Sequence, residues 1–333
     1  MLYYIGTYTN LGGPGVAVVD VCADQISILS TEGSLKDPSY VILSKDKTRL
    51  YAVCGGESPG DDGYAATYAV DGASLTLLNK AALNASGPCH LCLSADEKYL
   101  YTANYMSGSL SVIKLTDGSL VQVIQHTGSG PNADRQEAAH MHQVGFIPGT
   151  NILWAVDLGT DSVFTYRQDA ATGVLSDAES LKVPGGLGPR HLAFAQNGRD
   201  VYLAQEMGNE LSHIRWNGTS LEWVASYPSL PADYKNESTT AAVRLSPNGK
   251  KVYISNRGHD SLAAFAVSAD GSLAAVGHID SFGNTPRDFQ IIADDRALIA
   301  NQDSGTVAVI DISGREGVLL SECVIPGAVC ICA

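Results

Sequence analysis

One short sequence pattern recurs through the chain at intervals of roughly 48 residues, and a fixed period of this length is the signature of a repeat architecture. Each copy contains an apolar segment, a short polar turn and a second apolar segment that carries a large side chain. The six copies cover residues 37–53, 87–103, 142–156, 188–204, 240–255 and 285–300. Their large side chains are Tyr51, Tyr101, Trp154, Tyr202, Tyr253 and Leu298. The pattern predicts two strands joined by a tight turn in every copy.

A second turn follows each copy after a further alternating segment. These turns are Asp71-Gly72, Asp117-Gly118, Thr172-Gly173, Asn217-Gly218, Asp270-Gly271 and Glu316-Gly317. Asp-Gly and Asn-Gly pairs supply the positive φ angles that two-residue turns between twisted strands need. Each period therefore contains four strands, which is typical of a propeller blade.

The two ends of the chain supply a seventh blade. Residues 2–5 match a second strand, residues 18–29 supply the third and fourth, and residues 326–332 match the missing first strand. Pairing both ends in one sheet removes an edge that would otherwise expose unpaired backbone. We therefore predict an all-β fold: one domain over residues 1–333 that is a seven-bladed β-propeller. It has four antiparallel strands per blade, and the last blade is closed by the N- and C-terminal strands.

Charge and cysteine content restrict the partners and the compartment. The formal net charge is -14, a field that repels phosphate backbones and anionic lipid, so we expect neither nucleic acid nor a membrane as partner. The N-terminus lacks the pattern of a signal peptide, and no apolar run is long enough to span a membrane. The odd number of cysteines, seven, favours a reducing compartment, so we predict a cytoplasmic protein. We interpret the Cys89-x-x-Cys92 pair as buried strand cysteines.

Three repeats carry an ionisable side chain where the first strand begins. His142, Arg190 and Arg287 occupy this position, and the other repeats have Ser39, Cys89 and Ala241 there. The first strand of a blade lines the central channel, so packing does not explain cationic groups at this position. His140 lies on the same strand face as His142 and nearer the rim, because side chains alternate along a strand. His191 follows Arg190 directly.

The loops after the second strands carry a further polar set. Glu206 and Arg257 stand in two of them, and Asn104, Asp157 and Asn301 take the same position in three others. Polar groups that converge in a concave mouth are the usual form of a small-molecule site. We predict that His142, Glu206, Arg190 and Arg257 are catalytic. The predicted substrate contacts are Arg287, His140, Asn104, Asp157, His191 and Asn301.

These residues also have structural interpretations. His142 can be a hydrogen-bonded structural histidine, the arginines can pair with carboxylates, and Glu206 can be a solvated loop residue. His140 and His142 also suggest metal ligands, with Asp157 or Glu206 as a third. A third dedicated ligand and its supporting shell are not evident, so we predict no metal and no other cofactor.

Five segments together resemble the seven-bladed lactonase family, which contains cycloisomerase-type 6-phosphogluconolactonases and fungal carboxymuconate lactonizing enzymes. The segments are residues 128–146, 155–166, 188–194, 255–265 and 285–289, and the resemblance extends over essentially the whole chain. Residues 128–140, GSGPNADRQEAAH, look most like bacterial members. The resemblance implies that His142 is the channel histidine, Arg190 the arginine of a GPRH motif, and Glu206 and Arg257 the charged loop residues. It also implies that no metal is required.

The leading hypothesis is a 6-phosphogluconolactonase of the pentose phosphate route, acting on a small anionic sugar lactone. His142, with an ordinary pKa of about 6.5, is the first candidate for the base, and Glu206 either orients it or acts as the acid. The arginines bind phosphate and the developing oxyanion. A lactonizing cycloisomerase or another sugar-lactone enzyme is the second hypothesis, and a non-enzymatic binding scaffold is the third.

Overall fold

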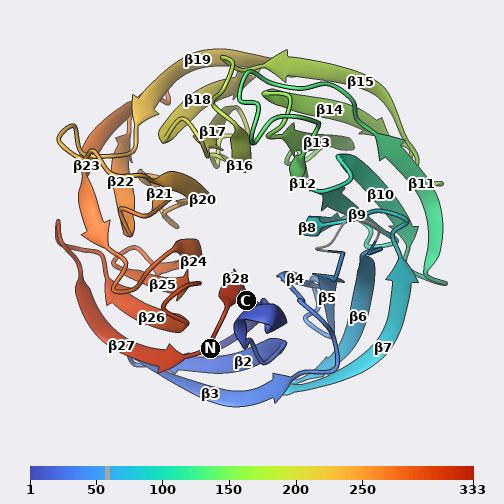
Figure 1. The fold of residues 1–333 in the computed structure, drawn as a ribbon, viewed down its shortest axis with the longest axis horizontal. Coiled ribbons are helices and arrows are strands. Elements are labelled where there is room, and N and C mark those ends of the chain that lie inside the picture. Colours follow the sequence, from blue (N-terminus) through green and yellow to red (C-terminus); the bar gives the residue numbers. More distant parts are fainter. Residues whose placement is uncertain (57–60) are drawn as a thin grey trace. The chain divides into compact units, whose positions relative to one another are not determined.

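The computed structural model describes residues 1–56 and 61–333, and in these residues β-strands are joined by turns (Figure 1). One short 3₁₀ helix, η1 (Thr9–Leu11), is the only helix in that part of the chain. None of the helical structure described is long and apolar enough to cross a membrane. The described residues group into two compact units, one formed by Met1–Gly33 with Arg190–Ala333 and the other by Ser34–Pro189.

The first unit contains four antiparallel sheets, and within each sheet every strand pairs with the next one named. They are β28 (Ala328–Cys332), β1 (Leu2–Thr7), β2 (Val16–Cys22) and β3 (Gln25–Glu32); β16 (Pro189–Phe194), β17 (Asp200–Gln205), β18 (Glu210–Trp216) and β19 (Leu221–Pro228); β20 (Thr239–Leu245), β21 (Lys251–Arg257), β22 (Ser261–Val267) and β23 (Leu273–Asp280); and β24 (Pro286–Ala293), β25 (Arg296–Asn301), β26 (Thr306–Asp311) and β27 (Val318–Val324).

The second unit contains three sheets of the same kind. They are β4 (Tyr40–Leu43), β5 (Arg49–Cys54), β6 (Tyr64–Asp71) and β7 (Ser74–Ala82); β8 (Pro88–Leu93), β9 (Tyr99–Asn104), β10 (Ser109–Lys114) and β11 (Ser119–Gln125); and β12 (Met141–Phe146), β13 (Ile152–Asp157), β14 (Ser162–Gln168) and β15 (Leu175–Lys182). Seven four-stranded antiparallel sheets confirm the predicted fold class, a seven-bladed β-propeller. That residues 1–333 make a single domain stays a prediction.

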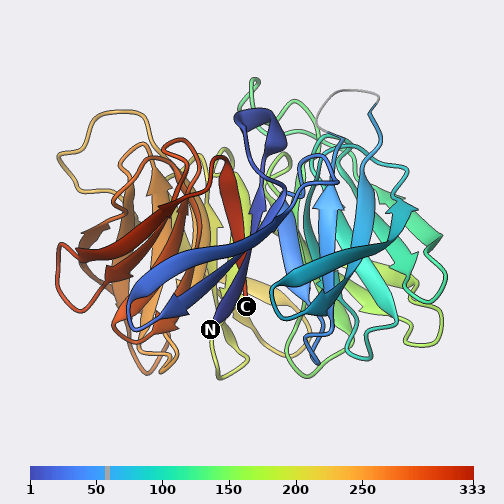
Figure 2. The ribbon, with the colours of Figure 1, turned by 90° about the horizontal axis from the view of Figure 1, so that it is seen from below.

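Both ends of the chain contribute to one blade, as predicted. Strand β1 pairs with β28, with Ile5 opposite Ile331, and on its other side with β2 (Figure 2). The backbone N–H of Ile331 also donates to Asp288 Oδ2 on the neighbouring blade, at 2.9 Å. The C-terminal strand is thus fixed on two sides.

The aromatic side chain and the X-Gly turn of the repeat meet between blades. The hydroxyl of Tyr202 on β17 donates to the carbonyl of Gly271, in the hairpin between β22 and β23, at 3.0 Å. Tyr101 on β9 makes the equivalent bond to Gly173 at 2.9 Å. A buried tyrosine hydroxyl needs a partner, and in these two cases the turn of the next blade supplies one.

Candidate active site

The first strands bulge where the sequence places its ionisable residues. On β12, Met141 pairs with Asp157 and Gln143 pairs with Val156, so His142 is the extra residue of a bulge. On β24 the register shifts in the same way at Arg287. The equivalent bulge on β8 contains Cys89, whose thiol donates to the carbonyl oxygen of His142 at 3.3 Å. A bulge re-aims one side chain out of the strand alternation, so this position presents its side chain differently from the rest of the strand.

The second strands end in a register that differs from the prediction. In five blades the last ladder pair is Asn104 with Ser109, Asp157 with Ser162, Gln205 with Glu210, Asn256 with Ser261, and Asn301 with Thr306. Glu206 and Arg257 therefore stand one residue later than Asn104, Asp157 and Asn301. The predicted equivalence of these positions was wrong by one residue. The true equivalents of Glu206 and Arg257 in the other three blades are Tyr105, Leu158 and Gln302.

Asn104, Asp157 and Asn301 each have no exposed surface and bond within the protein. Asp157 accepts the backbone N–H groups of His140, Gly159 and Thr160 at 2.8, 3.0 and 3.2 Å. The Asn104 amide donates to Ser109 and Ser111, and the Asn301 amide donates to the carbonyl of Ser281. These contacts fix the strand ends and neighbouring turns, and the predicted substrate contact of the three residues stays a prediction.

Glu206 links two arginines within the first unit. Its Oε2 lies 2.9 Å from Nε of Arg190 and 2.9 Å from the NH2 nitrogen of Arg257. The Arg190 and Glu206 side chains are 3% and 5% exposed, whereas that of Arg257 is 14% exposed. The NH2 nitrogen of Arg257 also donates to the backbone carbonyl of Thr240 at 3.0 Å. These three predicted catalytic residues thus come together in one place.

This cluster has an excess of positive charge. Two guanidinium groups beside one carboxylate stabilise the ionised form of Glu206 and leave a formal charge of +1 on the three side chains. An arginine held by a carboxylate presents its remaining N–H groups in a fixed direction. The arrangement suits recognition of an anion, or of an oxygen that becomes negative during a reaction. His191, the neighbour of Arg190 on β16, is buried, and its substrate contact stays a prediction.

Arg287 is held by two residues that sequence reasoning missed. Its NH1 nitrogen donates to Gln302 Oε1 at 3.2 Å, and its NH2 nitrogen donates to the Tyr8 hydroxyl at 3.0 Å. The guanidinium carbon also lies 5.3 Å from the centroid of the Tyr8 ring. A strict alignment of the loop sequences would have placed Gln302 opposite Glu206 and Arg257. Tyr8 is harder to find, because its blade is split between the two ends of the chain.

In the second unit, Tyr105 brings the two histidines of the HxH motif together. Its ring stacks on His140, with centroids 4.4 Å apart, and meets His142 edge to face at 5.6 Å. The ring nitrogens of His140 lie 3.0 Å from the Tyr105 carbonyl and 3.1 Å from Glu137 Oε1. Both histidines are buried. Tyr105 is therefore a further residue of this cluster that the loop alignment could have supplied.

The metal interpretation gains no support from these contacts. Within residues 1–56 and 61–333, no group of three or more His, Cys, Asp or Glu side chains is arranged to hold a metal ion. Both nitrogens of His140 already face protein acceptors. Cys89 and Cys92 lie on β8, and burial raises the pKa of the Cys92 thiol, whereas a metal or redox site needs a lowered one.

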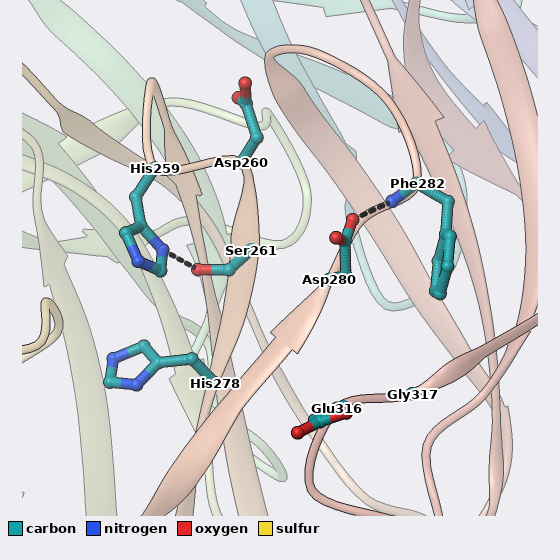
Figure 3. Close-up of a pocket in the computed structure, with 8 residues that line it drawn as sticks. All are labelled: His259, Asp260, Ser261, His278, Asp280, Phe282, Glu316 and Gly317. Atoms are coloured by element: carbon teal, nitrogen blue, oxygen red, sulfur yellow. Dashed lines mark hydrogen bonds between the residues drawn. The ribbon is translucent and has the colours of Figure 1, made fainter.

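A separate pocket of about 570 Å³ opens between the blades β20–β23 and β24–β27 (Figure 3). His259 and His278 face one another on one side of it, and Asp280, Phe282 and Glu316 lie on the other. Burial, followed by the nearby His278 ring, lowers the pKa of His259. None of the ten predicted site residues lines this pocket.

The sequence and the fold are similar to those of known proteins. The model of the family described as "Lactonase, 7-bladed beta-propeller" matches residues 2–332. A 6-phosphogluconolactonase of Bacillus subtilis is 34% identical, over 98% of this chain and 97% of that protein. The crystal structure of a protein from Lactobacillus plantarum is 30% identical with a TM-score of 0.91, over 99% of this chain and 98% of that one. The periplasmic gluconolactonase of Pseudomonas aeruginosa is 29% identical with a TM-score of 0.90, over 99% of this chain and 98% of that enzyme.

Proposed function

The chain belongs to the seven-bladed β-propeller lactonase family and is a lactone hydrolase, and we propose that its substrate is 6-phosphoglucono-δ-lactone, which it opens to 6-phosphogluconate. The observation that carries this proposal is the arginine content of the candidate site. Arg190 and Arg257 converge on Glu206, and Arg287 is oriented by Tyr8 and Gln302. An unphosphorylated lactone offers these arginines only the oxyanion that develops on its carbonyl, whereas the phosphorylated one also carries a dianion that a further arginine can bind.

The family membership excludes the scaffold hypothesis, but it does not determine the compartment. The 34% identical relative is a 6-phosphogluconolactonase, and a similar solved structure is a periplasmic gluconolactonase. Cytoplasmic location and a place in the pentose phosphate route therefore stay predictions that follow from the proposed substrate.

The reaction needs a base, an acid and a site for the oxyanion. Water adds to the lactone carbonyl as it loses a proton, the carbonyl oxygen becomes negative, and the ring oxygen leaves and takes up a proton. We assign the first proton transfer to His142, whose ordinary pKa of about 6.5 suits proton exchange near neutral pH. Its water-activating role rests on its equivalence with Arg190 and Arg287 in the repeat and on the family resemblance.

Glu206 is better suited to positioning than to acid catalysis. A general acid must hold a proton, and the two guanidinium groups 2.9 Å away favour the carboxylate without one. We therefore assign Glu206 the role of aligning Arg190 and Arg257, and we assign that pair the stabilisation of the oxyanion. Loss of one preorganised donor at such a site typically costs about 10²–10³-fold in kcat.

The proposal is tested by measuring proton release from a panel of lactones. The panel contains 6-phosphoglucono-δ-lactone, glucono-δ-lactone and muconolactone-type substrates, with blanks for spontaneous opening. We expect a kcat/KM at least about 100-fold higher for the phosphorylated lactone, since two charge-assisted hydrogen bonds contribute about 1.5–3 kcal/mol each. Arg257→Gln should lose most activity, whereas the exposed Arg167→Gln is the matched control and should lose none. Equal rates on the phosphorylated and unphosphorylated gluconolactones would contradict the proposed substrate. A preference for a carboxymuconate-derived lactone would favour the lactonizing alternative.

A further inference from the structure

We propose that Tyr8 and Gln302 are positioning residues that fix Arg287 as the phosphate contact, so that this clamp of three residues sets the preference for a phosphorylated lactone. The inference rests on the proposed function and assigns the phosphate end of the substrate to one arginine. We call these three residues the Arg287 clamp.

The clamp combines residues from two neighbouring blades of the first unit. Arg287 occupies the bulge of β24, and Gln302 follows the last residue of β25. Tyr8 follows the last residue of β1, in the blade closed by the chain termini. Strand β24 packs against β28, which pairs with β1. The contact therefore joins segments that are 279 residues apart in sequence.

Tyr8 and Gln302 occupy the same position in their blades. The backbone N–H of Tyr8 donates to the carbonyl of Gly327, which directly precedes β28, at 2.9 Å. The backbone N–H of Gln302 donates in the same way to Thr285, which directly precedes β24. Glu206, which orients the other two arginines, also follows the end of a second strand. One blade position thus supplies the groups that orient all three arginines.

Arg190 and Arg257 differ from Arg287 in the charge of the groups that they contact. Arg190 and Arg257 contact a carboxylate, which offsets part of their charge. The contacts of Arg287 with Tyr8 and Gln302 are to neutral oxygens, and they orient the guanidinium. A guanidinium has five N–H donors in a rigid fork. An oriented guanidinium is the group that binds a phosphate through two parallel hydrogen bonds.

Tyr8 can also take part in binding directly. Its hydroxyl accepts a hydrogen bond from Arg287, and a phenol hydroxyl can accept one bond and donate another at the same time. A phosphate oxygen beside Arg287 is a suitable acceptor for that proton. Arg287, Tyr8 and Gln302 are all partly exposed, so a ligand can reach them, in contrast to the buried Glu206.

The test compares clamp variants on the phosphorylated and unphosphorylated gluconolactones. The ratio of the two kcat/KM values should fall about 3- to 10-fold in Tyr8→Phe, which keeps the ring and removes one neutral hydrogen bond. Gln302→Glu should lower the ratio more than Gln302→Leu, because the new carboxylate both neutralises Arg287 and repels phosphate. We expect these losses to appear in KM more than in kcat. Tyr3→Phe, on the strand that precedes Tyr8, is the matched control and should keep the wild-type ratio.

A second measurement separates failure of the clamp from failure of the proposed function. Binding of inorganic phosphate to the intact protein is measured by calorimetry, with no turnover required. Weaker phosphate binding in Tyr8→Phe, Gln302→Glu and Arg287→Gln than in wild type and Tyr3→Phe supports the clamp even if no lactone is hydrolysed. Clamp variants that bind phosphate as wild type does, or that keep the wild-type substrate ratio, overturn it. Thermal melting of each variant shows whether it is folded.

Discussion

At the scale of single residues, the account depends on Glu206 as a buried anion between two cations. Its carboxylate contacts Arg190 and Arg257 through the same oxygen, Oε2, and its side chain is only 5% exposed. Each charge in such a cluster is tolerated because of the others. Replacing Glu206 with a neutral residue therefore leaves two positive charges together, whereas replacing one arginine leaves a pair of opposite charges.

We predict that Glu206→Gln destabilises the protein more than Arg257→Gln. The first change leaves two guanidinium groups side by side with no carboxylate between them, and breaking a buried ion pair in this way costs about 3–5 kcal/mol. The second change leaves Arg190 and Glu206 as a balanced pair. Urea unfolding of both variants gives the free energies of unfolding. Equal losses, or a larger loss in Arg257→Gln, would contradict the cluster as described.

Sequence reasoning could find the ionisable members of the site because they break the repeat. His142, Arg190 and Arg287 stand where other blades have small residues, so their positions are visible without coordinates. Gln302 and Tyr105 could not be singled out in this way, because a glutamine or tyrosine in a loop is ordinary. Asn104, Asp157 and Asn301 were compared with Glu206 and Arg257 one residue out of register, which a strict alignment of the loop sequences would have avoided.

At the scale of elements, the blade is stabilised by its turns as much as by its strands. Gly271 has a φ of +83° and accepts the hydroxyl bond of Tyr202. A Cβ at Gly271 would lie 2.5 Å from Asp200 Oδ1, and Asp200 is itself buried and bonded to His213 and Arg215. The hairpin therefore packs against a charged network in the preceding blade.

We predict that Gly271→Ala is much more destabilising than Gly218→Ala. Both glycines lie in the hairpin between the third and fourth strands of a blade and have positive φ, so both changes cost about 1–2 kcal/mol in backbone strain. A Cβ at Gly218 meets no heavy atom within 4 Å, so Gly218→Ala isolates that strain. The additional loss in Gly271→Ala measures the packing against Asp200. Similar melting temperatures for the two variants would show that the hairpin does not depend on that contact.

The element pattern is the part of the structure that sequence predicts best. A repeat of this length, with X-Gly turns at a fixed place, determines the number of strands and their order along the chain. The first-strand bulges at Cys89, His142 and Arg287 could not be predicted, because the sequence carries no signal for one extra residue in a ladder. These bulges aim the site residues, so the site was harder to predict than the fold.

At the scale of the whole molecule, titration of buried and turn groups determines the response to acid. Burial lowers the pKa of His126 below 6.5, and its Nε2 lies 2.7 Å from the Tyr166 hydroxyl. Burial opposes ionisation of Asp200, but hydrogen bonds from His213, Asn197 and Arg215 outweigh it and lower its pKa. Hydrogen bonds from Ser44 and Thr48 lower the pKa of Asp46 to about 2.

We predict that stability falls in two stages as the pH decreases. Below about pH 6.5 the unfolded chain protonates at His126 while the folded chain does not, so proton uptake favours unfolding. Below about pH 4 the same holds for Asp200 and Asp46, whose folded pKa values lie below 3.8. The unfolding free energy is measured from pH 8 to pH 3 for wild type and for His126→Gln. A wild-type slope between pH 6.5 and 5 that His126→Gln retains would exclude this histidine as its source.

The most direct test of the central claim is a crystal structure of the protein with 6-phosphogluconate bound. The account predicts that the product carboxylate contacts Arg190 or Arg257, and that its phosphate contacts Arg287 together with the hydroxyl of Tyr8. A product bound elsewhere, for example in the pocket lined by His259 and His278, with none of these arginines in contact, would contradict the account.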